Sequence, residues 1–274
     1  MENLSNTLVI IIRKVIKNMN EYIVSSAEML KDTPSIAGAV PKWRLGNKYI
    51  KLSTLINGYE SYSEVIVSKL GSLLGFNVCE YKLCIVNVDN QKKYIGCEST
   101  DFTKCNYELV DFVQLGLQGY FSVTELNSKE IYSWLGSIKK EKYLEEVLTL
   151  VYLTLDTDRH LGNLALFQNT NTMELELAPL FDFGAALLST KTVPTRYTEK
   201  ITKILKCKPF SIDWDRQLSL LEDKLPVIVD YRKGIAQFVR ELPKELSEER
   251  KRFIIELLNA RYEDYMELRK RLID

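Results

Sequence analysis

The sequence predicts an α+β protein of two lobes, with a small lobe built on an antiparallel β-sheet and a larger, mainly helical lobe. Apolar residues alternate or run together over residues 48–53, 78–85 and 94–97, which indicates strands. From Tyr107 onward the apolar residues recur at helical spacing instead. We therefore expect a small lobe at residues 33–102 and a large lobe at 103–274, after an N-terminal helical segment at 1–32.

The N-terminal segment carries one apolar helical face, formed by Leu8, Ile11, Ile12, Val15, Ile16 and Met19. Ile23, Ala27 and Leu30 extend this pattern as a second helix. We expect this face to pack against the body of the same chain, and docking on a partner protein is the alternative.

Composition excludes several classes of protein. Hydrophobic residues make up 46% of the 274 residues, which is enough for a large core. Lys and Arg total 37 and Asp and Glu total 37, so the charge balance indicates neither a nucleic-acid nor a membrane partner. No apolar run approaches the roughly 20 residues that span a bilayer.

Cysteine usage indicates a reducing compartment. The five cysteines are an odd number without a Cys-x-x-Cys pair, and Cys79, Cys84 and Cys97 fall in apolar, strand-like segments. They are expected to be buried thiols of a cytoplasmic protein rather than a disulfide framework. A single histidine argues against a zinc site.

Residues 156–184 carry the strongest functional signal. Two short apolar runs, 164–167 and 174–177, flank a polar stretch and predict a hairpin, which folds Asp182 back beside Asn163. Asp158, in Asp-Arg-His-Leu-Gly-Asn, completes a set of two carboxylates and one amide.

Such a set suits phosphoryl transfer from ATP. Asp158 would orient or deprotonate the acceptor hydroxyl as the catalytic residue, while Asn163 and Asp182 would bind Mg²⁺. Asp156 is a rival for the role of Asp158, but its spacing to Asn163 does not fit the pattern. His160 is expected to shape the loop rather than to carry a proton.

The small lobe offers a lysine and a glutamate that would hold a nucleotide. Lys51 lies among apolar residues of a predicted strand, and Glu64 begins a predicted helix that ends at Gly75. Together they match the lysine–glutamate pair of a kinase small lobe. Glu60 is the fallback, and a solvated acid in the first helical turn is the alternative reading of Glu64.

The loop at residues 34–44 combines small residues with a lysine, so its backbone amides could approach a phosphate closely. It is not a Walker A loop. On its own chemistry it could equally be an ordinary surface loop.

These motifs resemble those of the HipA-like serine/threonine kinases and, more distantly, the phosphatidylinositol kinases. The matching segments are Ser35-Ile-Ala-Gly-Ala-Val-Pro-Lys42, Lys51, Glu64, Asp158-Arg-His-Leu-Gly-Asn163 and Pro179-Leu-Phe-Asp182. The resemblance implies a two-lobed protein-kinase-like fold, ATP and Mg²⁺ as cofactors, and a protein substrate with a Ser or Thr acceptor.

The resemblance also implies further site residues. Ser35, Gly38, Ala39 and Lys42 would cover the ATP phosphates, and Ser35 matches a position that can be autophosphorylated. Glu98 and Thr100 occupy the place of the adenine-binding hinge, and His160 would join the ATP-binding set. The chain is shorter than the toxin kinases of this family, so an antitoxin-type partner is a possibility that the resemblance alone does not support.

Three function classes remain open: a protein serine/threonine kinase, a kinase of a small molecule or lipid, and a non-catalytic nucleotide-binding regulator. Arg196, Lys200 and Lys203 follow Asp-Phe-Gly, where they could receive an acidic peptide or a phosphate, or form a solvated face. Residues 213–274 are predicted to form two or three helices with a core that includes Leu218, Leu221, Ile235, Phe238, Phe253, Leu257 and Leu258.

Overall fold

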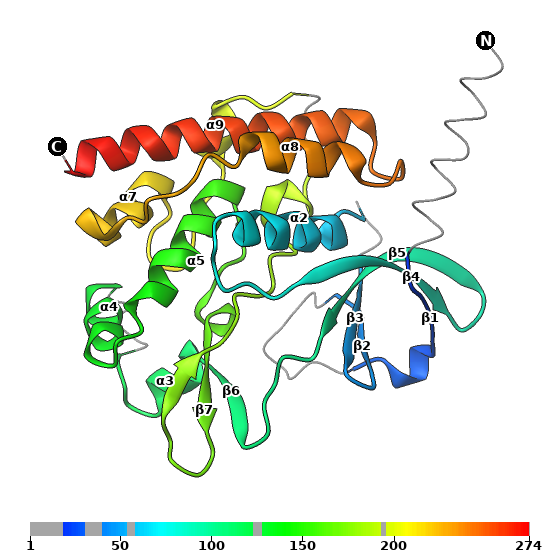
Figure 1. Ribbon diagram of the computed structural model, residues 1–274, viewed down its shortest axis with the longest axis horizontal. Helices are drawn as coiled ribbons and strands as arrows, with labels where there is room; N and C mark the ends of the chain where they lie inside the picture. Colours follow the sequence, from blue (N-terminus) through cyan, green and yellow to red (C-terminus); the bar gives the residue numbers. More distant parts are fainter. Residues whose placement is uncertain (1–18, 31–39, 54–57, 123–127, 193–195, 274) are drawn as a thin grey trace.

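The structure, a computed structural model, describes residues 19–30, 40–53, 58–122, 128–192 and 196–273. In this part of the chain, a five-stranded sheet has the order β1-β4-β5-β3-β2. Its strands are β1 Glu21–Val24, β2 Lys42–Leu45, β3 Lys48–Leu52, β4 Tyr81–Val88 and β5 Lys92–Thr100. The sheet curls at one end of the molecule, with most helices at the other end (Figure 1). The predicted α+β fold with a sheet lobe and a helical lobe is confirmed.

The N-terminal prediction is wrong for residues 21–30. Residues 21–24 form β1, which pairs in parallel with β4, and a single 3-10 turn, η1 Ser26–Glu28, follows. Tyr22, Ile23 and Val24 are aromatic or β-branched, and such residues favour a pleated, half-buried strand. The small sheet is therefore antiparallel except at this edge. Residues 1–18 of the predicted helix lie outside the described residues.

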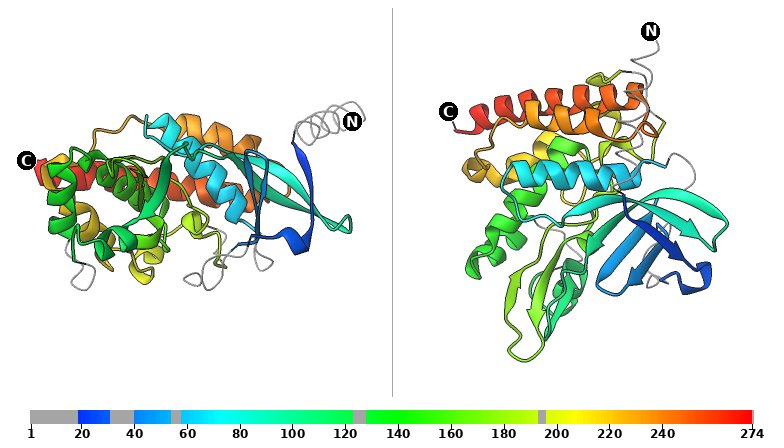
Figure 2. Two further views of the ribbon diagram at one scale, coloured as in Figure 1. Left: turned by 90° about the horizontal axis from the view of Figure 1, so that it is seen from below. Right: turned by 45° about the vertical axis from the view of Figure 1, so that its right-hand side comes forward.

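Helix α2 Glu60–Leu73 connects the two lobes. It lies between the five-stranded sheet and helix α8 Arg232–Glu241, which Figure 2 also shows from a second side. Gly75 follows the helix with φ of +73°, so its predicted end is confirmed. The predicted start is late, because α2 begins at Glu60 and Glu64 lies in its second turn.

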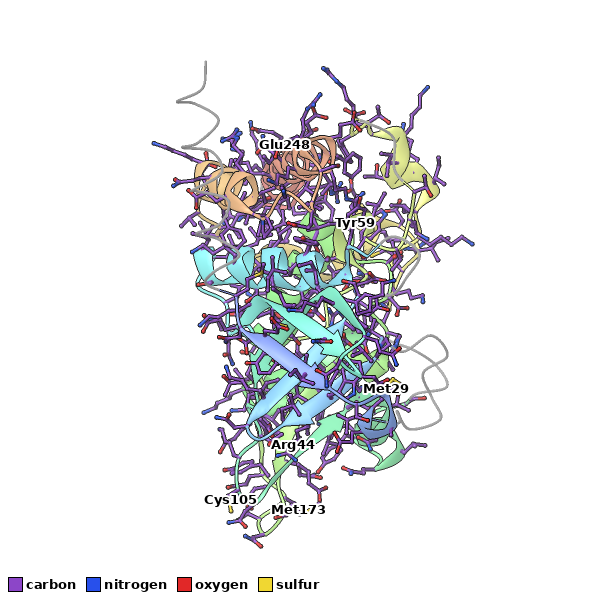
Figure 3. All side chains as sticks on the ribbon, turned by 90° about the vertical axis from the view of Figure 1, so that its right-hand side faces the viewer. Met29, Arg44, Tyr59, Cys105, Met173 and Glu248 are labelled. Atoms are coloured by element: carbon purple, nitrogen blue, oxygen red, sulfur yellow. The ribbon has the colours of Figure 1, made fainter. Side chains whose placement is uncertain are left out.

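A second sheet, with the order β6-β7-β8, begins the large lobe. Its strands are β6 Tyr107–Asp111, β7 Ala165–Asn169 and β8 Leu175–Leu177. β7 and β8 pair in antiparallel fashion, which confirms the predicted hairpin. Cys105 is exposed in the loop before β6, near Met173 in the β7–β8 turn, at the lower end of the view in Figure 3.

Helix α5 Glu141–Thr154 forms the centre of the large lobe and leads directly into residues 156–163. It is buried on nearly all sides and packs on helix α9 Glu248–Ile273. The remaining helices are α3 Phe112–Leu117, α4 Ser128–Ser137, α6 Lys200–Ile204 and α7 Trp214–Leu218, with 3-10 turns η2 Leu161–Asn163, η3 Ala186–Leu188 and η4 Ser219–Lys224. Six of the seven predicted core residues of the C-terminal region are buried, and Phe238 is partly buried.

The thiols of Cys79, Cys84 and Cys97 are buried, as predicted, and so is that of Cys207. Burial raises the pKa of Cys84 to about 12, so this thiol is not activated. Within the described ranges, no helix combines the length and the apolar character needed to cross a bilayer.

Candidate active site

Lys51, the last but one residue of β3, forms ion pairs with the carboxylates of Glu64 and Asp182. Its Nζ lies 2.7 Å from Glu64 Oε1 and 2.8 Å from Asp182 Oδ1, and it is 5.3 Å from the centre of the Tyr81 ring. Burial opposes the charge of this ammonium, but the carboxylates of Asp182 and Glu64 outweigh burial and raise the pKa of Lys51 well above its usual range. Lys51 is therefore a fixed cation at the point where β3, α2 and the segment around Asp182 meet.

Glu64 is the residue of α2 that holds Lys51. Its side chain is only 3% exposed, and Oε2 accepts a hydrogen bond from Phe183 N at 2.8 Å. Burial raises the pKa of Glu64, although Lys51 opposes this shift. The ion pair therefore goes to the predicted glutamate and not to the fallback Glu60, which is also buried in the first turn.

Asp182 projects its carboxylate into the cleft from a strained backbone. Its φ is +63°, a left-handed conformation that Asp adopts more readily than most residues. The nearby charges of Lys51, Arg159 and Lys42 outweigh burial and hold the pKa of Asp182 well below its usual range. The side chain is still 43% exposed, so an ionised carboxylate faces the open side of the cleft.

Arg159 joins the loop that contains Asp158 to the segment that contains Asp182. Its guanidinium, 1% exposed, donates to the carbonyl oxygens of Asn163, Phe181 and Asp182 at 2.8, 2.9 and 2.8 Å. It also pairs with Asp156 at 2.9 Å. One rigid group with several donors thus fixes two chain segments beside each other.

The buried pair with Arg159 explains the role of Asp156. This carboxylate is only 1% exposed, so it cannot reach an acceptor in solvent. Burial raises the pKa of Asp156, and the charge of Arg159 opposes that shift. Asp156 is therefore a buried partner of Arg159, and the catalytic role of Asp158 stays a prediction.

Asp158 lies at the open end of the same loop, with a side chain that is 56% exposed. Its carbonyl oxygen accepts a hydrogen bond from Asn163 Nδ2 at 3.0 Å, and its carboxylate lies 3.2 Å from Lys208 Nζ. Because the amide nitrogen of Asn163 is used inside the loop, its Oδ1 remains as a donor atom for a metal ion. His160 lies directly before η2. Its ring packs so close to Gly162 that a Cβ added to this glycine would lie only 3.1 Å from the ring nitrogen Nδ1.

The oxygens of Asp182 and Asn163 fit Mg²⁺, which takes oxygen ligands and usually only one or two protein carboxylates. Arg159 binds the carbonyl groups of both residues, so the two side chains start from adjacent backbone. No cluster of three or more His, Cys, Asp or Glu suited to a metal occurs among the described residues. This donor set suits magnesium bound together with phosphates better than zinc.

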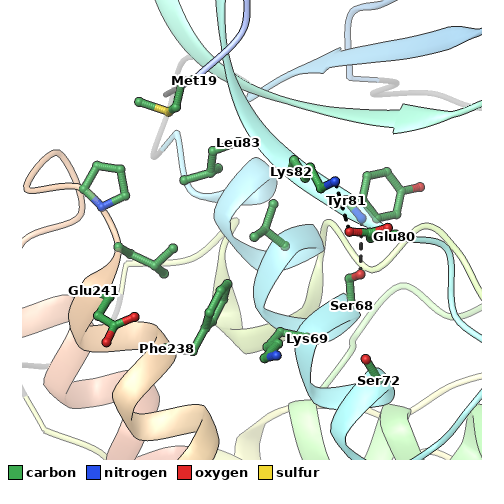
Figure 4. Close-up of a pocket in the computed structure, with 13 residues that line it drawn as sticks. Met19, Ser68, Lys69, Ser72, Glu80, Tyr81, Lys82, Leu83, Phe238 and Glu241 are labelled. Atoms are coloured by element: carbon green, nitrogen blue, oxygen red, sulfur yellow. Dashed lines mark hydrogen bonds and ion pairs between the residues drawn. The ribbon is translucent and has the colours of Figure 1, made fainter. Parts of the chain in front are cut away.

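A separate groove of about 490 Å³ lies on the outer side of α2. Figure 4 shows Ser68, Lys69 and Ser72 of α2 facing Phe238 and Glu241 of α8, with Leu83 of β4 beside them. Lys51, Glu64, Asp158 and Asp182 do not line this groove. It is therefore distinct from the cleft where the charged residues meet.

Comparison with known proteins identifies the same architecture. No family model matches the chain. A curated relative, the serine/threonine-protein kinase CtkA of Helicobacter pylori (strain J99), is 30% identical over 137 residues, which cover 46% of this chain and 40% of CtkA. The match thus spans well under half of the length of that relative.

Two solved structures match over most of the chain. The crystal structure of the H. pylori proinflammatory kinase CtkA matches with a TM-score of 0.63 and 19% identity, covering 92% of this chain and 99% of that one. HipA of Shewanella oneidensis MR-1, solved with HipB and operator DNA, matches with a TM-score of 0.54 and 17% identity over 88% of this chain and 70% of HipA. The chain has the fold of the HipA-like kinases. The resemblance predicted from the sequence is confirmed.

The structure does not bring every HipA-like position to the cleft. In β5, Glu98 pairs with Ile50, whereas Lys51 pairs with Cys97, so Glu98 and Thr100 lie on the opposite face from Lys51. Glu98 accepts hydrogen bonds from Asn20 and Tyr22 there. These two side chains therefore point away from Lys51, and the role of their segment as the adenine-binding hinge stays a prediction.

Part of the predicted phosphate-binding loop remains untested. Ser35, Gly38 and Ala39 lie outside the described residues, whereas Lys42 lies in β2 directly opposite Lys51. Like charges opposite each other destabilise a sheet unless anions compensate them. The charge of Lys42 helps to lower the pKa of Asp182, so Lys42 lies near this carboxylate. Lys42 therefore stays a candidate for binding an anion beside Asp182.

Three further residues of the site were not predicted. Arg159 was part of the motif but received no role, because its neighbours Asp158 and His160 are polar and gave no sign that it would be buried. Ser63 of α2 donates to the carbonyl oxygens of Phe183 and Ala186 at 2.9 Å each, which docks the Asp-Phe-Gly segment on the helix. Lys208 reaches Asp158 only through the tertiary fold, so no local pattern indicated it.

Proposed function

We propose that this protein is an ATP- and Mg²⁺-dependent serine/threonine protein kinase of the HipA-like type. The observation that supports it most is Lys51 Nζ between Glu64 and Asp182, at 2.7 and 2.8 Å, in a chain that shares the fold of CtkA. A lysine of a sheet, a glutamate of a helix and an Asp-Phe-Gly aspartate in contact are the parts that position a nucleotide in kinases.

Each residue then has a physical role. Lys51 would contact the α- and β-phosphates, with Glu64 fixing its ammonium, and Lys42 would add positive charge toward the γ-phosphate. Asn163 and Asp182 would hold Mg²⁺, which neutralises phosphate charge when bound. Arg159 acts indirectly, because it keeps the backbones of these two residues adjacent.

Asp158 would accept a hydrogen bond from the acceptor hydroxyl and orient it for attack. The acceptor oxygen forms a bond to the γ-phosphorus as the bond between that phosphorus and the β-phosphate oxygen breaks. The acceptor proton passes to Asp158 or to the phosphate, and ADP leaves. Catalysis on this account is mostly positioning and charge stabilisation, for which enzymes use preorganised groups.

Incubation with ATP labelled at the γ-phosphate tests this assignment. We expect Mg²⁺-dependent label on serine or threonine of the protein itself or of an added protein, and mass spectrometry would show whether Ser35 carries phosphate. Label confined to a small molecule or to a lipid extract would contradict the protein-kinase assignment. ATP binding without any transfer would instead identify a nucleotide-binding regulator.

A further inference from the structure

A second pocket, of about 490 Å³, opens beside the carboxylate of Asp158. Two segments that follow Asp-Phe-Gly form its walls together with the loop that contains Asp158. Its lining residues are Thr157, Asp158, Ala185, Thr190, Lys191, Ile204, Leu205, Lys206 and Lys208. The pocket adjoins the proposed acceptor position and so lies where the acceptor segment of a substrate would enter.

The charge of this pocket is strongly positive. Three lysines line it against one carboxylate, Asp158, and that carboxylate already pairs with Lys208 at 3.2 Å. Lys191 and Lys206 are exposed, and neither makes an ion pair with any residue in the described part of the chain. Two positive charges are thus available to an anionic group on a bound molecule.

An apolar surface lies next to these charges. Ile204, at the end of α6, is 78% exposed, and the partly buried Leu205 follows it. Burial of apolar area is favourable, so a bound chain that covers Ile204 would gain from this contact. A small phosphorylated molecule would use the lysines but would gain little from Ile204. A peptide with both carboxylates and apolar side chains would use both features.

We propose that this pocket selects acceptor segments in which the phosphorylated Ser or Thr is flanked by Asp or Glu. This inference rests on the proposed kinase function, because it assigns the substrate class of the same site. A carboxylate of the substrate would pair with Lys191 and Lys206. A further carboxylate would draw Lys208 away from Asp158, which leaves Asp158 free to contact the acceptor hydroxyl.

Direct binding measurements test the pocket without requiring catalysis. Fluorescence anisotropy would compare an acidic Ser-containing peptide with its Gln/Asn isostere on the full chain. We expect the acidic peptide to bind on the order of tenfold more tightly, because each exposed ion pair contributes only a few-fold. This preference should weaken at high NaCl, since salt screens exposed charges.

Two double variants locate the effect. Lys191→Glu with Lys206→Glu should remove the preference for the acidic peptide, whereas Lys233→Glu with Lys244→Glu, an equal charge change at exposed positions on and after α8, should retain it. Circular dichroism would confirm that both double variants are folded. These variants leave Asp158 and Lys208 unchanged.

The outcomes separate this inference from the proposed function. Equal binding of the acidic and neutral peptides, or an unchanged preference in Lys191→Glu with Lys206→Glu, would overturn the inference even if the chain transfers phosphate. If inorganic phosphate binds tightly and neither peptide binds, the pocket is a site for small anions. This result would also overturn the inference. A charge-dependent preference without any phosphate transfer would support the pocket and refute the kinase assignment.

Discussion

Replacing Arg159 with Met should destabilise the protein more than any surface substitution. The change leaves the carboxylate of Asp156 buried without its partner and removes the donors to three backbone carbonyl groups. It also removes the contact of the guanidinium with the Phe183 ring, 4.0 Å from its centre. Removing one partner of a buried ion pair costs about 3–5 kcal/mol. Since whole domains are stable by only about 5–15 kcal/mol, this would be a large fraction of the total.

Urea denaturation followed by circular dichroism would measure the effect. We expect the free energy of unfolding to fall by about 3–5 kcal/mol in Arg159→Met. Arg252→Met, on the exposed face of α9, should change it by less than about 0.5 kcal/mol. Adding Asp156→Leu to Arg159→Met should recover part of the stability, because no buried charge remains without a partner.

The same variants separate stability from function. In Asp156→Leu with Arg159→Met, the carbonyl groups of Asn163 and Asp182 still lack their shared donor, so we expect phosphate transfer to stay low in the folded double variant. A loss of less than about 1 kcal/mol in Arg159→Met, within the range of an exposed ion pair, would refute the reasoning.

Three other predictions concern the cleft and the sheet. Lys51→Met should lower kcat for phosphate transfer about 10²–10³-fold, as for loss of one preorganised charge, and steady-state kinetics showing less than a threefold change would contradict its role. Gly96→Ala should lower the free energy of unfolding in urea by about 1–3 kcal/mol, because the added Cβ would lie 2.5 Å from the Lys51 carbonyl oxygen. The control Gly136→Ala in α4 should not lower it, because the added Cβ meets no atom within 4 Å. The pKa of Asp182 in the folded protein is below its ordinary value of 3.8, so the ionised carboxylate stabilises the fold above pH 3.8 and this stabilisation is lost only at lower pH. The difference in unfolding free energy between wild type and Asp182→Asn should therefore persist as the pH is lowered to 3.8. Loss of this difference near pH 5 would contradict the reasoning.

Local sequence patterns predicted the parts of the fold that depend on nearby residues. The hairpin of β7 and β8 follows from two apolar runs around a polar turn, and α5 follows from one long helical pattern. Lys51, Glu64 and Asp182 could be predicted as one site because each belongs to a motif with a known spacing. The structure places Lys51 in contact with both carboxylates.

The rest depended on contacts between distant segments. Residues Glu21–Val24 form β1 because they pair with β4, whereas the helical spacing of Ile23, Ala27 and Leu30 had predicted a helix. The end of β5 was predicted too early, at Cys97, because Glu98, Ser99 and Thr100 are polar, although they pair with β3 and belong to the strand. The start of α2 was missed because the buried side chains of its first turn are mostly polar, with Glu60, Ser61 and Ser63 beside Tyr62. Ser63 is buried there because it hydrogen-bonds to the segment after Asp182.

The most direct measurement of the central claim compares Mg-ATP binding and phosphate transfer in wild type, Asp158→Asn and Asp182→Asn. Asp158→Asn should bind Mg-ATP as wild type does and transfer no phosphate, since the proposed role of Asp158 is toward the acceptor hydroxyl and not toward the nucleotide. Asp182→Asn should lose the Mg²⁺ dependence of ATP binding, because the proposal assigns the carboxylate of Asp182 to the metal. Phosphate transfer at the wild-type rate by Asp158→Asn, or unchanged Mg²⁺-dependent binding by Asp182→Asn, would contradict the account.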